Sequence, residues 1–307
     1  MHLRARAHLA LFTVNLLYGV NYVVAKGLMP DVIGASGFIL LRVLGAGALF
    51  WVLRAIYPEP IAPRDLPRLL LCAVTGVAVN QLMFFHGLMR TSPINASIIM
   101  VATPVLVLLL SAMLIGERLT TSKVLGVSLG AGGAIGMVLH GANGQAASAH
   151  GWGDLFILVN AIAYGLYLVL VKPLMARYSA VTVMAWGFLF GLFMVLPFGW
   201  NELWSVRWGS LSAPIWASLG FVVVMVTFVA YLLNTWALRH MNASVVGVYI
   251  YLQPVLAALF SWWFMWLGPE RIGLPGRYDT TIGPIQMLCA AAIFTGVYLV
   301  GRRTRCA

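Results

Sequence analysis

The sequence predicts an all-α membrane protein of ten transmembrane helices, arranged as two inverted five-helix repeats with the N- and C-termini in the cytoplasm. Three observations predict this fold class: the composition, the number of apolar segments, and motifs that recur in both halves of the chain. Hydrophobic residues make up 62% of the 307 residues and charged residues only 9%, whereas a soluble domain carries about 25% charged residues. This composition excludes a soluble enzyme, a disordered chain and a disulfide-built secreted module.

Ten segments are long and apolar enough to cross a bilayer, which takes about 20 mostly apolar residues. In chain order they are 9–29, 32–56, 66–88, 93–115, 120–140, 155–175, 180–198, 215–238, 243–267 and 282–300. The connections between them are too short for a soluble domain. The Gly- and Ala-rich stretch 141–154 is predicted to be a linker between a first repeat, 1–140, and a second repeat, 155–307.

The net charge of +11 indicates membrane topology rather than nucleic-acid binding. The 19 Lys and Arg residues are scattered, whereas a nucleic-acid-binding protein gathers them on one face. With a cytoplasmic N-terminus, most of them fall on the inner side, as the positive-inside rule requires. The sequence therefore predicts a multi-pass protein of the cell membrane, surrounded by lipid and without a nucleic-acid partner.

Short motifs recur in the same order in the two halves. The matching pairs are Tyr18-Gly19 with Tyr164-Gly165, Lys26 with Lys172, Leu28-Met29 with Leu174-Met175, Pro104-Val105-Leu106 with Pro254-Val255-Leu256, and Gly116-Glu117-Arg118 with Gly268-Pro269-Glu270-Arg271. Because each half holds five predicted spans, an odd number, the second half enters the membrane the other way round. This is the inverted-repeat plan of secondary transporters, which bind substrate near the midplane between the halves.

Three of these stretches resemble a known family. They are residues 18–26 of the first span, Leu41-Arg42 of the second, and the block from Pro104 to Thr120. With them the chain resembles the ten-helix, EamA-type members of the drug/metabolite transporter superfamily over nearly its whole length. The resemblance implies a transporter rather than an enzyme, without cofactor or metal. It also implies export of small metabolites, with amino acids as the leading class, by alternating access through a central cavity.

All six charged residues inside the predicted spans are basic. An exporter of organic cations that exchanges them for protons needs a carboxylate within the membrane, so a zwitterion, a weak acid or a neutral metabolite fits better. Lys26 lies near a span end, where it either snorkels to the interface or faces the cavity. Arg42 lies too deep for snorkelling and is expected to point inward. His86 is either an ordinary hydrogen-bonded histidine or, if protons are the coupling ion, the residue expected to carry them.

Polar side chains in lipid are unfavourable, so most are expected to face the bundle interior as cavity walls or as interhelical hydrogen bonds. The residues predicted to bind substrate are Tyr18, Asn21, Lys26, His86, Tyr164, Tyr167, Tyr231, Asn234, Tyr251 and Gln253. The residues predicted to be structural or gating are Asn15, Arg42, Pro104, Glu117, Lys172, Pro254 and Glu270.

Two further patterns concern helix geometry. Pro104 and Pro254 each remove a backbone donor in a span and either form a hinge or leave a static kink. Small residues in spans 120–140 and 282–300 favour close helix packing, so these two spans are expected to support the bundle or a dimer rather than line a cavity. The sequence leaves monomer and homodimer open.

Two other functions remain as alternatives. One is a translocator of lipids or lipid-linked sugars from the same superfamily, which requires a lateral opening to the bilayer. The other is a membrane enzyme or a structural subunit. An enzyme needs paired catalytic groups, which the sequence lacks, and a structural subunit does not need a duplicated polar face within the membrane.

Overall fold

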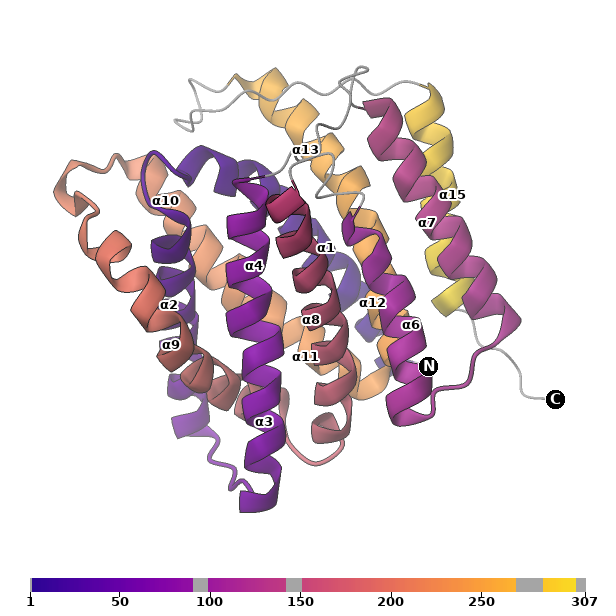
Figure 1. Ribbon diagram of the computed structural model, residues 1–307, viewed down its shortest axis with the longest axis horizontal. Helices are drawn as coiled ribbons and strands as arrows, with labels where there is room; N and C mark the ends of the chain where they lie inside the picture. Colours follow the sequence, from indigo (N-terminus) through magenta and orange to yellow (C-terminus); the bar gives the residue numbers. More distant parts are fainter. Residues whose placement is uncertain (1, 91–98, 142–150, 269–283, 302–307) are drawn as a thin grey trace.

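The computed structural model describes residues 2–90, 99–141, 151–268 and 284–301, and every regular element within these ranges is a helix (Figure 1). The helices, with π- and 3-10 segments marked η, are α1 (His2–Leu28), α2 (Ala35–Ile56), η1 (Pro63–Asp65), α3 (Leu66–Ala73), η2 (Val74–Ala78), α4 (Val79–Leu88), α6 (Ala102–Ile115), α7 (Thr121–Gly141), α8 (Gly151–Met175), α9 (Ala180–Trp204), η3 (Trp208–Ser210), α10 (Ala213–Phe221), η4 (Val222–Val229), α11 (Ala230–His240), α12 (Ala243–Val248), η5 (Tyr249–Tyr251), α13 (Leu252–Leu267) and α15 (Pro284–Gly301).

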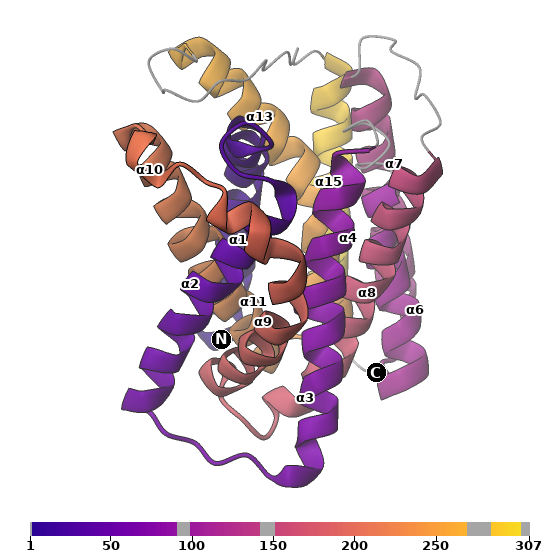
Figure 2. The same cartoon turned by 60° about the vertical axis from the view of Figure 1, so that its left-hand side comes forward.

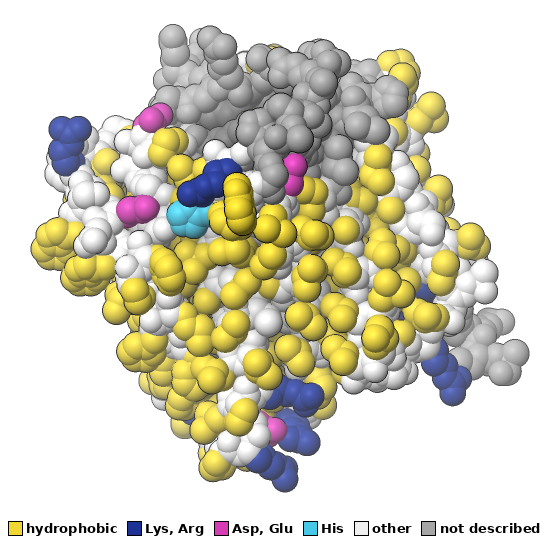
Figure 3. All heavy atoms as spheres, viewed as in Figure 1, with side chains coloured by type: hydrophobic (Ala, Val, Ile, Leu, Met, Phe, Trp, Pro, Cys, Tyr) yellow, Lys and Arg dark blue, Asp and Glu magenta, His cyan; other side chains and the backbone are white. Residues whose placement is uncertain are grey.

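The all-helical, multi-pass character is confirmed. Within the described residues, seven helical segments are long and apolar enough to cross a membrane: Leu3–Ala25, Ala35–Ile56, Pro63–Leu88, Trp152–Met175, Ala180–Trp204, Ala213–His240 and Ala243–Leu267. Two shorter apolar helices, Ala102–Ile115 and Met287–Gly301, accompany them. Hydrophobic side chains cover the middle of the visible face, and Lys and Arg lie toward its edges (Figure 3). The count of ten spans stays a prediction.

Several helices extend beyond the spans predicted for them, among them α1, which begins at His2 instead of residue 9. α9 continues to Trp204 instead of ending at 198, and α8 begins at Gly151, inside the segment predicted as linker. Glu202 therefore lies within α9, although the predicted spans themselves contain no acidic residue. Its carboxylate accepts a hydrogen bond from the Gly37 N–H of α2 at 2.8 Å, so the end of α9 is held against the start of α2.

Two spans contain π-helical segments, which are uncommon and occur often at functional sites. One is η2, between α3 and α4, and the other is η4, between α10 and α11. They lie in the third predicted span of each half. Gly76 within η2 leaves room for a neighbouring ring, because a Cβ there would lie only 2.3 Å from the Tyr167 ring.

Glycines bring α7 and α15 into close contact, as the sequence predicts for these two spans. A Cβ on Gly133 would lie 2.8 Å from the Cys289 carbonyl oxygen, and one on Gly296 would lie 2.6 Å from the Gly126 carbonyl oxygen. The two helices run side by side at one edge of the bundle (Figures 1 and 2). They therefore pack within the chain.

The first turns of α1 and the last residue of α15 lie at the same end of the bundle (Figure 2). A Cβ on Gly301 would lie 3.0 Å from the His8 ring. We call this the terminal end of the bundle, and the other the distal end.

A loop residue, Glu59, joins the segment after α2 to the start of α9. Its carboxylate accepts hydrogen bonds from the Ser179 N–H at 2.9 Å and the Ser179 hydroxyl at 2.8 Å. Burial raises the pKa of this carboxyl, but hydrogen bonds from Thr182 and Ser179 and the charge of Arg239 lower it more. The net effect holds the pKa of Glu59 below the ordinary value of a glutamate.

Candidate functional site

A cavity of about 100 Å³ lies between α1, α2, α4, α8, α11 and α13. Six residues that the sequence analysis selected line it: Tyr18, Asn21, Arg42, Tyr164, Tyr231 and Gln253. They come from helices of both predicted halves. The structure therefore brings together side chains that lie far apart in the sequence. Among them are Tyr18 and Tyr164, the tyrosines of the repeated Tyr-Gly motif in α1 and α8.

Hydrogen bonds hold the walls of this cavity. Gln253 accepts a hydrogen bond from the Tyr22 hydroxyl at 3.3 Å and donates one to Asn15 Oδ1 at 3.2 Å. On the opposite side, Asn234 Nδ2 donates to the Tyr164 hydroxyl at 3.1 Å. Asn15 and Asn234 do not line the cavity themselves, so they orient its lining residues from behind.

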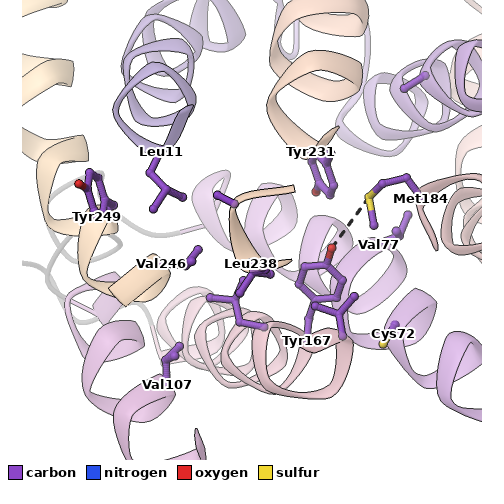
Figure 4. Packing of buried hydrophobic residues seen from close by; sticks show 14 of the residues in the cluster. Leu11, Cys72, Val77, Val107, Tyr167, Met184, Tyr231, Leu238, Val246 and Tyr249 are labelled. Atoms are coloured by element: carbon purple, nitrogen blue, oxygen red, sulfur yellow. Dashed lines mark hydrogen bonds between the residues drawn. The ribbon is translucent and has the colours of Figure 1, made fainter. Parts of the chain in front are cut away.

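Two of the predicted tyrosines are core residues instead of cavity residues. Tyr167 is buried among Cys72, Val77 and Met184, and its hydroxyl points toward the Met184 sulfur (Figure 4). The same hydroxyl lies 3.2 Å from Thr235 Oγ1. Tyr251 faces α7, where a Cβ on Gly130 would lie 2.4 Å from its ring. Neither ring lines the cavity.

His86 lies outside the cavity, near the distal end of α4. Its Nε2 lies 2.8 Å from Ser36 Oγ, and Arg90 Nη1 donates to the His86 carbonyl oxygen at 2.9 Å. The histidine therefore joins α4 to the first turn of α2. His86 also lies near Glu202 and Arg90, so these residues form a polar cluster at the distal end of the bundle.

Glu117 and Lys172 lie at the terminal end, where a wide opening of about 990 Å³ separates the helix ends. Glu117 forms an ion pair with Lys123 at 2.7 Å and accepts a hydrogen bond from the Ser244 hydroxyl at the start of α12. Lys172 donates to the carbonyl oxygens of Leu238 and Met241, at the end of α11. Glu117 thus ties the segment between α6 and α7 to the start of α12, and Lys172 ties α8 to the end of α11.

Both prolines of the repeated motif lie at corresponding places in interrupted helices. Pro104 is the third residue of α6, which follows a turn at Val101, and Pro254 is the third residue of α13, which follows the 3-10 segment η5. A proline is tolerated there because the first turn of a helix needs no internal N–H donor. Met100 and Ile250, which lie two residues before α6 and α13, line the cavity.

Some predicted residues lie outside what the structure describes. Glu270 is in the segment 269–283, and the side chains of Lys26 and Pro254 are not among the described ones. The backbone of Lys26 lies in α1, near its end.

Several cavity residues were not selected as site residues from the sequence. They are Tyr22, Asn80, Gln81, Phe84, Phe85, Met100, Asn160 and Ile250. Tyr22 lies four residues after Tyr18, about one helical turn along α1. Asn80, Gln81 and Asn160 are amides in apolar spans. Their polarity is the feature of the sequence that could have marked them as cavity residues. The face that Asn80 and Gln81 occupy could not be derived, because η2 shifts the helical register of their span.

The polar groups of the cavity include several buried atoms that have no hydrogen-bond partner among the described residues. These are Asn21 Oδ1, Asn160 Oδ1, and both Oε1 and Nε2 of Gln81. In the same described region, no group of three or more His, Cys, Asp or Glu side chains is arranged to hold a metal ion. The arrangement offers hydrogen bonds, one cation and aromatic surface, which suits the binding of a small polar molecule.

Comparison with known proteins places this geometry in context. The sequence model of the EamA-like transporter family matches residues 5–139 and 151–271. A "probable terminal-alkyne amino-acid exporter" from Streptantibioticus cattleyicolor is 27% identical over 284 residues, covering 89% of this chain and 86% of that protein. An uncharacterized transporter from Archaeoglobus fulgidus is 27% identical over 263 residues, covering 86% and 87% of the two chains. The uncharacterized transporter YetK from Bacillus subtilis is 25% identical over 260 residues, covering 83% and 78%.

A solved crystal structure of a protein aligns with a TM-score of 0.74 at 18% identity, over 96% of both chains. At this identity the likeness concerns the fold.

Proposed function

The chain belongs to the EamA-like transporter family of the drug/metabolite transporter superfamily, and from this premise we propose that it exports a small metabolite, with amino acids as the leading class, across the cell membrane. Transport proceeds by alternating access through the central cavity, either coupled to an ion gradient or driven by the substrate gradient alone. The name of the relative from Streptantibioticus cattleyicolor, an amino-acid exporter, supports this class.

One observation carries the proposal: the cavity is lined by polar and aromatic side chains from both halves of the chain. Tyr18 and Asn21 come from α1, whereas Tyr164 and Tyr231 come from α8 and α11. A site between two halves can be exposed to one side of the membrane and then to the other when the halves move relative to each other. At about 100 Å³ the cavity is smaller than the roughly 300–1,000 Å³ pockets of drug-sized ligands, which suits a small metabolite.

The proposed topology has ten spans in two inverted repeats, 1–140 and 155–307, joined by 141–154, with both termini in the cytoplasm. Three features support it. The π-helical segments begin at Val74 and Val222, in the same span of each half. Pro104 and Pro254 occupy the same position in α6 and α13. The terminal end of the bundle carries Arg4, near the chain start, and the basic residues around the wide opening there.

The test is efflux of labelled amino acids from proteoliposomes that contain the purified protein, with and without a pH gradient. Tyr231→Phe removes a hydroxyl from the cavity wall, whereas Tyr298→Phe removes one from an exposed position on α15 and serves as the matched control. We expect saturable efflux of one amino-acid class that Tyr231→Phe reduces and Tyr298→Phe leaves unchanged. Stimulation by the pH gradient identifies protons as the coupling ion.

Absence of efflux of every compound in the panel from a folded protein would contradict the proposal. The same vesicles, loaded with a fluorescent phospholipid, then test the alternative, a lipid or lipid-linked sugar translocator. Size-exclusion chromatography of the purified protein decides between monomer and homodimer.

A further inference from the structure

Arg42 is a buried cation in the middle of α2. It is 4% exposed, and its Nε donates a hydrogen bond to Thr227 Oγ1 at 2.9 Å. Its guanidinium carbon lies 5.5 Å from the centre of the Phe38 ring and 5.2 Å from that of Phe85. The described residues form two ion pairs, and Arg42 takes part in neither.

Such an arrangement is costly unless something else supplies the negative charge. Arginine stays protonated in proteins and carries five N–H donors in a planar fork. One hydrogen bond and two aromatic rings leave most of this donor capacity unused. A buried charge without a charged partner is strongly unfavourable. Because Arg42 lines the central cavity, a molecule bound there lies within its reach.

Three of the residues that line the same cavity carry hydrogen-bond acceptors of the complementary kind. Gln81 and Asn160 are each 2% exposed, and their amide oxygens have no partner among the described residues. The Oδ1 atom of Asn21 is in the same situation. Asn160 is fixed by its other amide atom, since its Nδ2 donates to the Asn80 carbonyl oxygen at 2.6 Å. Amide oxygens accept hydrogen bonds from an ammonium group without adding a full negative charge.

We propose that Arg42 binds the carboxylate of the transported molecule and that the amide oxygens of Asn21, Gln81 and Asn160 bind its ammonium group, so that the site selects small amino-acid zwitterions. This inference rests on the proposed transport function and assigns its substrate class. A guanidinium and a carboxylate form two parallel charge-assisted hydrogen bonds. Phe84 and Phe85 supply the apolar surface for a small side chain.

The first arm of the test changes the ligand and leaves the wild-type protein intact. For the amino acid that the protein transports best, inhibition of its uptake into proteoliposomes is compared with that by its carboxamide and its decarboxylated amine. For alanine these compounds are alaninamide and ethylamine. Losing a charged hydrogen-bond partner costs roughly 10- to 100-fold in affinity, so both analogues are expected to inhibit that much more weakly. Equal inhibition by the amino acid and its carboxamide would overturn the proposal.

The second arm changes the protein. In Arg42→Gln the preference for the amino acid over its carboxamide is expected to fall to within about threefold. Arg54→Gln is the matched control, because Arg54 lies on the same helix but donates to the Glu59 carbonyl oxygen and stacks on Trp51, away from the cavity. It should keep the wild-type preference. Unchanged preference in a folded Arg42→Gln protein would contradict the role of the guanidinium. If that variant does not fold, Arg42→Lys, which keeps the charge but loses the fork, takes its place.

The two proposals fail in different ways. If the wild-type protein transports none of the compounds, the transport function itself fails. If it transports a compound without a carboxylate as well as an amino acid, the transport function stands and the role of Arg42 falls.

Discussion

The repeated Tyr-Gly motif offers a direct test of the packing, because its two glycines are equivalent in sequence but not in surroundings. A Cβ on Gly19 would lie 2.7 Å from Leu256 Cβ and 3.2 Å from the Leu256 carbonyl carbon. A Cβ on Gly165 would have its nearest neighbours at 3.5–3.7 Å, which is ordinary contact. Gly19→Ala and Gly165→Ala therefore make the same chemical change in a tight site and in an open one.

The expected magnitudes follow from these distances. Carbon atoms pack best at about 3.5–4.0 Å, so α1 and α13 must separate by roughly 0.8 Å to accept the methyl group at Gly19. Overpacking of this kind costs about 1–3 kcal/mol. Both variants gain up to about 1 kcal/mol from the better helix propensity of alanine. Because this gain is common to both, the difference in unfolding free energy between the variants equals the overpacking cost, about 1–3 kcal/mol.

The assay is thermal unfolding of both purified variants in detergent, followed by efflux from proteoliposomes. Gly165→Ala should match or exceed the wild-type melting temperature. Gly19→Ala should melt lower and transport more slowly, since the displaced α1 carries Tyr18 and Asn21 of the cavity wall. Equal melting temperatures for the two variants, or a lower one for Gly165→Ala, would refute the reasoning.

Three further predictions concern helix contacts and pH. Glu117→Gln leaves Lys123 without a counter-charge and weakens the hydrogen bond to Ser244. We expect the free energy of unfolding to fall by about 3 kcal/mol, at the low end for a broken buried pair. An unchanged melting temperature would contradict this. Gly296→Ala places a Cβ 2.6 Å from a backbone oxygen of α7, whereas Gly132→Ala enters open space, so only the former should lower the melting temperature. Because the pKa of Glu59 is lowered in the folded protein, its ionised carboxylate stabilises the folded state at pH values above the ordinary carboxyl pKa. This stabilisation is lost as the pH falls. Glu59→Gln should therefore melt below wild type at neutral pH, and the difference should vanish in acid; a pH-independent difference would count against this.

The all-helical, multi-pass character and one face of the cavity could be predicted from the sequence, but not the rotation of every helix. On α1, Tyr18 and Asn21 lie at a spacing that a helix places on one face, and both line the cavity. On α8 the same argument applies to Tyr164 and Tyr167, yet only Tyr164 does so. Tyr167 turns toward η2, where Gly76 leaves space for its ring.

Tertiary contacts also decide where helices end. The length of the apolar segment predicted an end at residue 198, just before a Trp-rich stretch typical of a membrane interface. α9 instead continues to Trp204, and Glu202 reaches the first turn of α2. A hydrogen bond between segments so far apart in the sequence has no local signature. For the same reason Glu202 could not be recognised from the sequence as part of a polar cluster with Ser36 and His86.

The distribution of satisfied and unsatisfied polar groups along the bundle bears on how such a protein can transport. At the terminal end Glu117 already pairs with Lys123, and at the distal end Glu202 already binds the Gly37 N–H. These contacts join helix ends, and under the proposed alternating access they would exchange partners when either end of the bundle opened or closed. In the centre, Arg42 and Gln81 keep unused hydrogen-bonding capacity among the described residues. A substrate that meets them gains bonds without breaking existing ones, whereas a central site with satisfied polar groups would have to give up its own hydrogen bonds first. Binding energy is thus available at the centre, where it can offset the cost of rearranging the contacts at the ends.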